Sequence, residues 1–325
     1  MVDNPKNGRI RIVVLSVIAI AAASGFGVGM VFSDASSSQI REVDESLTEL
    51  VVAVVPQGDA SSFESQGEIL EDYFASKIGM NVRLFYPTDD TTTIASIGAG
   101  TTHVAFMSSR PAQLAYELNE GKALVFMAEL RPFQAEGGTE KLDTSYWSEY
   151  WVRADSDITA LEDARGNSVA FSGPLSTGGY LFPVAKLVED GMISSGGDPK
   201  EFFGNVVFSG GYQQSLMALL RGDVDVAAGD DWAVYTFLTP EEQSQIRVIE
   251  RQGPVPTHSV IYRSDIVSPD LITKFEKAMI DIKTERPELL DAALFGANEF
   301  VPANHHSHLD TLEAALELSR IPAIS

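Results

Sequence analysis

Short apolar runs alternate with helix-like segments along this chain, and α/β folds are the ones that accommodate such an order. Leu50–Pro56 (LVVAVVP) is continuously apolar, as a strand buried on both faces is. Phe63–Gly79 then carries apolar residues at helical spacing and ends in glycine. The same order recurs in the segments that follow, which are NVRLFYP, TTTIASIGAG, THVAFM, SSRPAQLAYELNEG and ALVFMAEL. This alternation predicts a parallel sheet covered by helices.

The second half of the chain continues this pattern after one change. Thr144–Ser156 (TSYWSEYWVRADS) is long and aromatic, as a strand that crosses between two lobes would be. Asn205–Tyr235 then supplies a strand, a helix, a strand and the start of another helix, and helices finish the chain from Ser268 onward. Because 325 residues exceed the usual size of one domain, we expect two.

The first 34 residues differ in character from the rest. Basic residues precede the uncharged run Ile12–Phe32, whose 21 residues are enough to cross a bilayer as a helix. Basic residues before the run favour an amino end inside and an exported remainder. Two interpretations stay open for residues 1–34: an uncleaved membrane anchor, or a signal sequence cleaved near Ser33–Ala35. Residues 35–49 are small and polar, as a tether is.

Charge and cysteine content exclude several classes of function. The formal net charge of −23 argues against nucleic-acid binding, which needs a basic surface. The chain contains no cysteine, which excludes disulfides, zinc–thiolate sites and thiol nucleophiles. The acidic balance leaves the charge of a bound ligand open, because the field of a site can oppose that of the whole protein.

The stretch SGPLSTGGYLFP places the hydroxyls of Ser176 and Thr177 before Gly178 and Gly179, where a helix begins. A helix N-terminus carries unsatisfied amides and a partial positive charge, so anions bind there. Glycines are poor helix formers, and their presence is explained if a ligand must approach the backbone closely. A simple cap by Ser176 is the other explanation, and the residues alone leave both open.

A nucleophilic role for Ser176 is disfavoured. A catalytic serine needs a positioned base, and no GxSxG elbow surrounds this one. The five histidines form no recognisable motif with it. We therefore expect no enzymatic activity and no cofactor.

A metal site is the other competing interpretation. The segment ANHHSHLD gathers His305, His306, His308 and Asp310, and imidazole suits zinc and copper. Adjacent histidines seldom reach the same ion, so a polar loop at the start of the last helix is favoured. We assign no metal ligand and keep the three histidines as candidates.

Two longer segments carry a family resemblance. Leu161–Pro183 reads LEDARGNSVAFSGPLSTGGYLFP, and Phe208–Asp231 reads FSGGYQQSLMALLRGDVDVAAGDD. They resemble the patterns DLkGKkVaF.dp.STSG.l.P and sG.H..sl.Al..G.vDaaa.ds of phosphonate/phosphite-type periplasmic binding proteins of ABC transporters. Upstream, VAVVPQGD, VRLFYPTDDTTTIASIGAG and THVAFMSS fit the opening strand–helix–strand order of that family. The likeness extends from Leu50 to the final helices.

The resemblance implies a type II periplasmic-binding-protein fold, with two α/β lobes and a cleft that closes by hinge motion. Lobe 1 would comprise residues 50–142 plus 251–325, and lobe 2 residues 143–250. The hinges would lie near Tyr146–Val152 and Gly253–Ser259.

The resemblance also implies an anion site at the serine turn. Ser176 and Thr177 would be hydroxyl donors, with the N–H groups of Gly178 and Gly179 beside them. Asp230 would accept a hydrogen bond from a protonated ligand oxygen or pair with a ligand amine.

This sequence departs from the family pattern at several positions of the expected site. Gly178 stands where the third motif residue is often serine, and Tyr212 replaces a histidine. An aromatic residue of the family corresponds to Asp90, and its turn gp.aY reads Ser108-Ser109-Arg110 here. These residues are kept as site candidates, and phosphate, phosphite, methylphosphonate and 2-aminoethylphosphonate all stay open as ligands.

The expected function is that of an extracytoplasmic solute-binding protein that captures a phosphonate, phosphite or phosphate-like oxyanion for ABC import. Its partners would be a small anionic ligand, a permease, and the membrane through the N-terminal helix. The alternatives are an extracytoplasmic sensor lobe, or a binder of another small ligand, including a metal held by the histidine loop.

Overall fold

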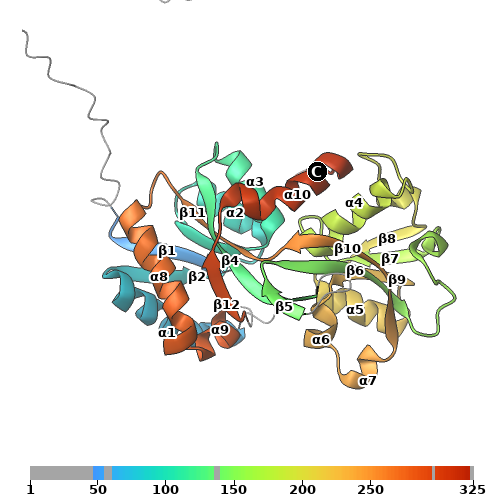
Figure 1. Cartoon of the computed structure of the whole chain (residues 1–325), viewed down its shortest axis with the longest axis horizontal. Coiled ribbons are helices and arrows are strands. Elements are labelled where there is room, and N and C mark those ends of the chain that lie inside the picture. Colours follow the sequence, from blue (N-terminus) through green and yellow to red (C-terminus); the bar gives the residue numbers. More distant parts are fainter. Residues whose placement is uncertain (1–46, 55–60, 135–139, 295–296, 323–325) are drawn as a thin grey trace, which may run out of the picture. The chain divides into compact units, whose positions relative to one another are not determined.

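The computed structural model describes residues 47–54, 61–134, 140–294 and 297–322, which belong to one compact unit, Glu42–Ser325 (Figure 1). The apolar run 12–32 lies outside the described residues, so its role as anchor or signal sequence stays a prediction. Within the described ranges, each helix is too short or too polar to cross a membrane.

Seven strands form the first sheet, in the order β12-β4-β11-β3-β1-β2, with β5 beside β4. Strands β1, β2 and β3 are parallel, whereas β11 pairs antiparallel with β3 and β4, and β12 antiparallel with β4. The sheet is therefore mixed rather than wholly parallel as expected, because β11 and β12 return from the second half of the chain. The bounds are β1 Glu49–Val54, β2 Asn81–Phe85, β3 Val104–Met107, β4 Ala123–Gln134, β5 Glu140–Asp143, β11 Ser259–Arg263 and β12 Glu299–Pro302.

Helices cover both faces of this sheet, because its central strands are apolar on both sides. Along β1, Leu50 and Val52 pack into one core cluster and Ala53 into the opposite one, as the two-residue period of a strand requires. The first cluster is closed by α1 (Ser61–Ile78), α8 (Pro269–Glu285) and α9 (Glu288–Ala293), and the second by α2 (Asp90–Gly98), α3 (Ser109–Leu118) and α10 (His305–Ser319).

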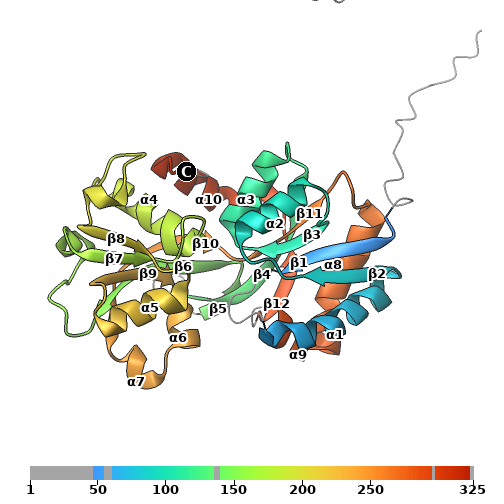
Figure 2. The same cartoon turned by 180° about the vertical axis from the view of Figure 1, so that it is seen from behind.

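Five strands form the second sheet, in the order β10-β6-β9-β7-β8. Strand β7 is parallel to β8 and β9, and β6 is antiparallel to β9 and β10. Helix α4 lies on one face of this sheet, and α5, α6 and α7 lie on the other (Figure 2). The bounds are β6 Ser145–Arg153, β7 Ser168–Phe171, β8 Asn205–Phe208, β9 Val226–Asp230, β10 Ile246–Pro256, α4 Phe182–Glu189, α5 Tyr212–Arg221, α6 Ala233–Phe237 and α7 Pro240–Gln243.

The chain crosses between the two sheets at two adjacent places, Thr144 and Thr257. The backbone N–H of Thr257 donates to the carbonyl of Thr144 at 3.0 Å, and its Oγ1 donates to the carbonyl of Glu129 at 2.6 Å. Strand β10 stays paired with β6 as far as Pro256, so the second crossing comes later than the boundary expected after Glu250.

The C-terminal helix α10 contacts elements of both sheets. It packs on α4 and β10 of the second sheet and on α3 and β4 of the first. Leu309 and Leu312 of α10 share one hydrophobic cluster with Leu181 and Phe182. A helix that the sequence assigned to lobe 1 therefore also joins the two halves.

Candidate functional site

The Ser-Thr-Gly-Gly turn follows the end of β7 and opens into a π-helical turn, Thr177–Leu181. Ser176 caps this turn, since its Oγ accepts the N–H of Gly179 at 3.0 Å. The N–H of Leu181 donates to the carbonyl of Ser176 at 3.1 Å, which is the i→i+5 bond of a π-turn. Single π-turns within helices are frequent at functional sites.

The two glycines are required by their own neighbours. A Cβ on Gly179 would lie 2.1 Å from Ser172 Oγ, and a Cβ on Gly178 would lie 2.7 Å from the hydroxyl of Tyr146. Both distances are far shorter than real side-chain contacts. Close packing of Ser172 and Tyr146 therefore explains the glycines, where the sequence suggested the approach of a ligand.

Two tyrosine hydroxyls lie beside this turn. Ser176 Oγ donates to the hydroxyl of Tyr212 at 3.3 Å, and Tyr212 interacts in turn with the hydroxyl of Tyr146. Burial raises the pKa of both tyrosines, and the nearby carboxylate of Asp230 raises them further. Both side chains therefore stay protonated at neutral pH and can donate hydrogen bonds.

A buried charged cluster extends from the first sheet to Asp230. Glu129 and Arg131 are two residues apart on β4 and share one face, and Arg131 Nε lies 2.9 Å from Glu129 Oε2. His258 Nδ1 lies 2.6 Å from the same carboxylate oxygen and 3.1 Å from Arg131 Nη2. The Arg131 guanidinium also lies over the ring of Trp232, with Cζ 4.7 Å from its centre.

Asp230 connects this cluster to the serine turn. The residue is 4% exposed, and Oδ1 accepts the N–H of Ala233 at 2.8 Å. Oδ2 lies 3.8 Å from Arg131 Nη1. Burial raises the pKa of Asp230, whereas Arg131 and His258 oppose that shift. The pKa of the neighbouring Asp231 is raised to about 7 by burial and by the charge of Asp230.

Asp90 lies at the start of α2, but the cap of that helix is Asp89, whose Oδ1 accepts the N–H of Thr92 at 2.7 Å. Oδ1 of Asp90 is buried without a hydrogen-bond partner in the described parts of the chain. Burial raises the pKa of Asp90 to about 6, against the opposing charge of His258.

Replacing Asp90 with asparagine is expected to stabilise the protein at pH 7 by about 1–2 kcal/mol, because a buried carboxylate is then no longer ionised. The folded-state pKa lies above the ordinary value, so Asp90 favours folding at low pH and loses that contribution as the pH rises towards about 6. Urea unfolding from pH 4 to pH 8 should show the gain of Asp90→Asn disappear near pH 4.

Asp89→Asn is the matched control, because hydrogen bonds from Thr92 lower the pKa of Asp89 and its carboxylate stabilises the fold at neutral pH. A gain of stability in Asp90→Asn that is independent of pH would contradict the assignment of a raised pKa.

The remaining predicted site residues mainly join the two halves of the molecule. Thr177 is 1% exposed, and its Oγ1 accepts the N–H of Arg110 at 3.0 Å, so a hydroxyl of the second half caps helix α3 of the first. The guanidinium of Arg110 donates to the carbonyls of Pro174 at 2.6 Å and Pro322 at 3.0 Å. Arg110 therefore ties α3 to the serine turn and to the C-terminal segment.

Ser108 and Ser109 have different surroundings. Ser109 Oγ donates to the carbonyl of Thr257 at 2.5 Å, at the second crossing between the sheets. Ser108 is the half-buried residue before α3, and its side chain makes no capping hydrogen bond to that helix. Only the hydroxyl of Ser109 therefore bonds to the backbone at the crossing between the sheets.

Several buried polar atoms of this region have no hydrogen-bond partner among the described residues. Buried polar groups in native proteins are nearly always paired, so such atoms call for an explanation. Donors and acceptors are both present in the set, which consists of Arg131 Nη1, Ser172 Oγ, Asp90 Oδ1 and Glu129 Oε1. The arrangement suits a small polar ligand that offers acceptors and at least one proton.

Comparison with known proteins assigns the chain to a family. The model of the family described as "ABC transporter, phosphonate, periplasmic substrate-binding protein" matches residues 52–309. The chain belongs to this family. The phosphate-import protein PhnD of Mycolicibacterium smegmatis is 25% identical over 264 residues, which cover 80% of this chain and 79% of that protein.

Solved structures show the same fold. A binding-protein component of an ABC phosphonate transporter from Pseudomonas aeruginosa matches with a TM-score of 0.66 and 19% identity, over 84% of this chain and 87% of that one. PhnD1 of Prochlorococcus marinus in complex with methylphosphonate matches with a TM-score of 0.67 and 15% identity, over 83% and 97% of the two chains. The predicted family and its two-sheet periplasmic-binding-protein architecture are thus confirmed.

The three histidines that were candidates for a metal site have different surroundings. His305 Nδ1 accepts the N–H of Val125 at 3.2 Å, and His308 Nε2 lies 3.3 Å from the carbonyl of Thr257. The side chain of His306 is 65% exposed. Within the described residues, no three His, Asp or Glu side chains are grouped so that they could hold a metal ion.

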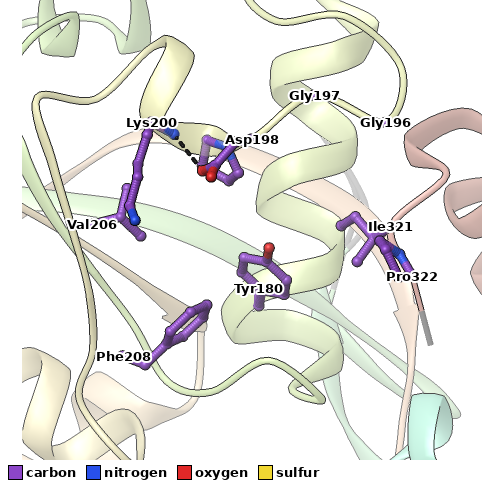
Figure 3. Close-up of a pocket in the computed structure, with 10 residues that line it drawn as sticks. Tyr180, Gly196, Gly197, Asp198, Lys200, Val206, Phe208, Ile321 and Pro322 are labelled. Carbon is purple, nitrogen blue, oxygen red and sulfur yellow. Dashed lines mark hydrogen bonds between the residues drawn. The ribbon is translucent and has the colours of Figure 1, made fainter. Parts of the chain in front are cut away.

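A cavity of about 330 Å³ lies elsewhere in the second half of the protein (Figure 3). Tyr180 and Phe208 line it from one side, and Ile321 and Pro322 of the C-terminal segment from another. None of its ten lining residues belongs to the polar cluster around Arg131. None of the ten is among the predicted site residues either, although Tyr180 belongs to the same π-helical turn as Thr177.

Sequence reasoning named candidates from the first half of the molecule, but it missed Glu129, Arg131 and His258. Glu129 and Arg131 are charged residues two apart at the end of the apolar run ALVFMAEL, and this same-face pair was an available signal. His258 precedes the apolar strand β11 in the same way.

Proposed function

We propose that this protein is an extracytoplasmic solute-binding protein that captures a tetrahedral phosphorus oxyanion and delivers it to an ABC permease. The observation that carries the proposal is the set of unpartnered buried polar atoms, to which both halves contribute and one of which, Arg131 Nη1, faces Asp230. The phosphate named for the Mycolicibacterium relative and the methylphosphonate bound to the Prochlorococcus protein are ligands of this chemical class.

The serine turn is the proposed anion site. Ser176 and Thr177 would donate hydroxyl hydrogen bonds, with the amide of Gly178 beside them. The amide of Gly179 would orient Ser176 Oγ, to which it donates at 3.0 Å. Tyr212, kept protonated by burial, would add a donor where the family has histidine. Ser108, from the start of α3, would reach the ligand from the first lobe. Hydrogen bonds to a charged oxyanion are shorter and stronger than neutral ones, which favours such a ring of donors.

Asp230 would accept a hydrogen bond from the protonated oxygen of a singly protonated oxyanion. An ionised carboxylate accepts hydrogen bonds only, so it repels a fully deprotonated oxygen and accepts a P–OH group. Asp90 and Asp231 add acidic groups that would suit an amine on the ligand. Phosphate, phosphite, methylphosphonate and 2-aminoethylphosphonate therefore form the ligand panel.

We further propose that the lobes close on the ligand by bending at Thr144 and Thr257. The contact between the Arg110 N–H and Thr177 Oγ1 joins the lobes next to the proposed site. No catalysis is proposed, because Ser176 has Tyr212 and the amide of Gly179 as its partners rather than a base. Residues 1–34 would export the protein, as anchor or as cleaved signal.

Calorimetric titration of the purified full-length chain, stripped of bound ligand, tests the proposal. One phosphorus oxyanion should bind with a micromolar or lower Kd, whereas sulfate should bind much more weakly. Thr177→Val should cost about 1–3 kcal/mol of binding free energy, because a donor to the anion is lost. Thr177→Ser is the matched control, since it keeps the hydroxyl that also caps α3. Absence of heat with every phosphorus oxyanion would contradict the proposed function.

A further inference from the structure

We infer that Arg131 is a ligand-binding and specificity-determining residue, and that Arg131 Nη1 and Asp230 Oδ2 together hold one protonated oxygen of the bound oxyanion. This inference rests on the proposed function and adds to it a residue that neither the serine motif nor the family pattern supplies.

The guanidinium of Arg131 is held at Nε and on one face. Nε lies 2.9 Å from Glu129 Oε2, and the ring of Trp232 covers one face. His258 Nδ1, 2.6 Å from the same Glu129 oxygen, lies 3.1 Å from Nη2. Arg131 is 5% exposed, and Nη1 has no hydrogen-bond partner among the described residues. A rigid planar fork with one donor group to spare is already oriented for a ligand oxygen.

The gap between Arg131 Nη1 and Asp230 Oδ2 has the width for one bridging oxygen. At 3.8 Å the two atoms are too far apart for a direct hydrogen bond. An oxygen about 2.8 Å from each atom closes the triangle at ordinary hydrogen-bond lengths. Such an oxygen must accept from the arginine and donate to the carboxylate. A P–OH group does both.

The second oxygen of Asp230 is not available for the same task. Oδ1 already accepts the N–H of Ala233 at 2.8 Å, which fixes the plane of the carboxylate and directs Oδ2 towards Arg131. Asp230 is also the β-sheet partner of Ser148, whose Oγ donates to the carbonyl of Gly178 at 2.5 Å, so Asp230 lies beside the serine turn. The remaining oxygens of a tetrahedral anion held at Arg131 thus fall towards the serine turn.

Charge balance sets the preferred protonation state of the ligand. The Arg131 cation is shared between the carboxylates of Glu129 and Asp230, with His258 adjoining Glu129. A dianion that carries no proton cannot donate a hydrogen bond to the Asp230 carboxylate, and the two negative charges repel each other. Monohydrogen phosphate and singly protonated phosphonates satisfy both partners, whereas sulfate at neutral pH carries no proton and satisfies only Arg131.

Two variants and a control test this inference on the full-length chain by calorimetry with phosphate, methylphosphonate and sulfate. Arg131→Lys keeps the charge but loses the planar fork, and should weaken binding of the best phosphorus ligand by about tenfold or more. Glu129→Gln combined with Arg131→Gln removes both charges of a buried pair, so it remains measurable if the single variant does not fold. Arg247→Lys is the control, because Arg247 donates to the carbonyls of Ser156 and Ile158 away from the site.

Selectivity separates a ligand contact from a merely structural role. Asp230→Asn should narrow the preference for phosphate over sulfate by about tenfold, since an amide can donate to an unprotonated oxygen. Arg131→Lys should reduce affinity for both anions, with unchanged affinities in Arg247→Lys. The inference would be overturned if both Arg131 variants bind with wild-type affinity. If Thr177→Val still weakens binding in that case, the proposed function stands. Failure of the wild type to bind any of the anions would overturn both.

Discussion

Replacing Gly179 with alanine should destabilise the protein by about 1–3 kcal/mol and weaken oxyanion binding at least tenfold. The new Cβ would lie 2.1 Å from Ser172 Oγ, 2.8 Å from Ser172 Cβ and 2.9 Å from Ser176 Oγ. Relief requires the turn to shift, and the cap that Ser176 makes on the Gly179 N–H shifts with it. Thermal unfolding and calorimetric titration of the same preparation measure the two effects.

Two further variants identify the cause. Gly173→Ala is the matched control in the same loop, because a Cβ there meets no atom within 4 Å. Ser172→Gly removes both atoms of Ser172 that the new Cβ would approach, so Gly179→Ala combined with Ser172→Gly should recover most of the lost stability. If Gly173→Ala and Gly179→Ala destabilise equally, the loss reflects backbone strain in the loop rather than contact with Ser172, and the packing explanation fails.

The strand ends were predictable from the sequence because each strand is a short apolar run with polar residues at its end. Ser172 follows β7 and Asp230 ends β9, as the apolar runs around them indicated. Strands β7 and β9 are parallel neighbours, so their ends meet at one edge of the sheet. Local pattern therefore predicted which residues stand at this edge, and their role in ligand binding stays a prediction.

The contacts of Arg131 and Arg110 depend on segments that lie far apart in the chain. Arg131 approaches Asp230 only because β4 and β9 belong to sheets that meet at the crossings, and no local pattern encodes that approach. The same limit applies to Arg110, whose buried guanidinium is directed to the carbonyls of Pro174 and Pro322. Residue type and spacing indicate that a charged side chain is present, but its partner is set by tertiary packing.

The glycines illustrate a different limit. Their presence after Ser176 and Thr177 correctly marked an unusual helix start, which the structure shows to be a π-turn. The reason for them was not accessible, because Tyr146 comes from β6 and reaches Gly178 across the sheet. A pattern that reports a lack of space cannot by itself say whether a ligand or a neighbouring side chain occupies that space.

Replacing Glu129 with glutamine should lower the free energy of unfolding by about 3–5 kcal/mol, the largest loss expected for a substitution that keeps the shape of the side chain. Glu129 is 1% exposed, and it faces Arg131 Nε at 2.9 Å and His258 Nδ1 at 2.6 Å. Burial opposes ionisation, but Arg131 and His258 outweigh it and hold the pKa of Glu129 below its usual range. Glutamine would leave the arginine buried without its main counter-charge.

The size of this loss is checked against an exposed pair and against removal of both charges. Glu49→Gln breaks the exposed ion pair in which Arg83 Nε lies 3.0 Å from Glu49 Oε2. This substitution should lower the free energy of unfolding by about 1 kcal/mol or less. Glu129→Gln combined with Arg131→Gln should be more stable than Glu129→Gln alone, since the arginine that lost its main counter-charge is removed as well.

Because the folded-state pKa of Glu129 is lowered, the stabilising effect of its carboxylate is complete above the ordinary pKa and is lost as the pH falls below it. Urea unfolding at pH 7 should therefore give the full difference between Glu129→Gln and the wild type. A difference no larger than that of Glu49→Gln would mean that the cluster at Arg131 is hydrated and adaptable. The rigid fork proposed for the ligand would then lose its physical basis.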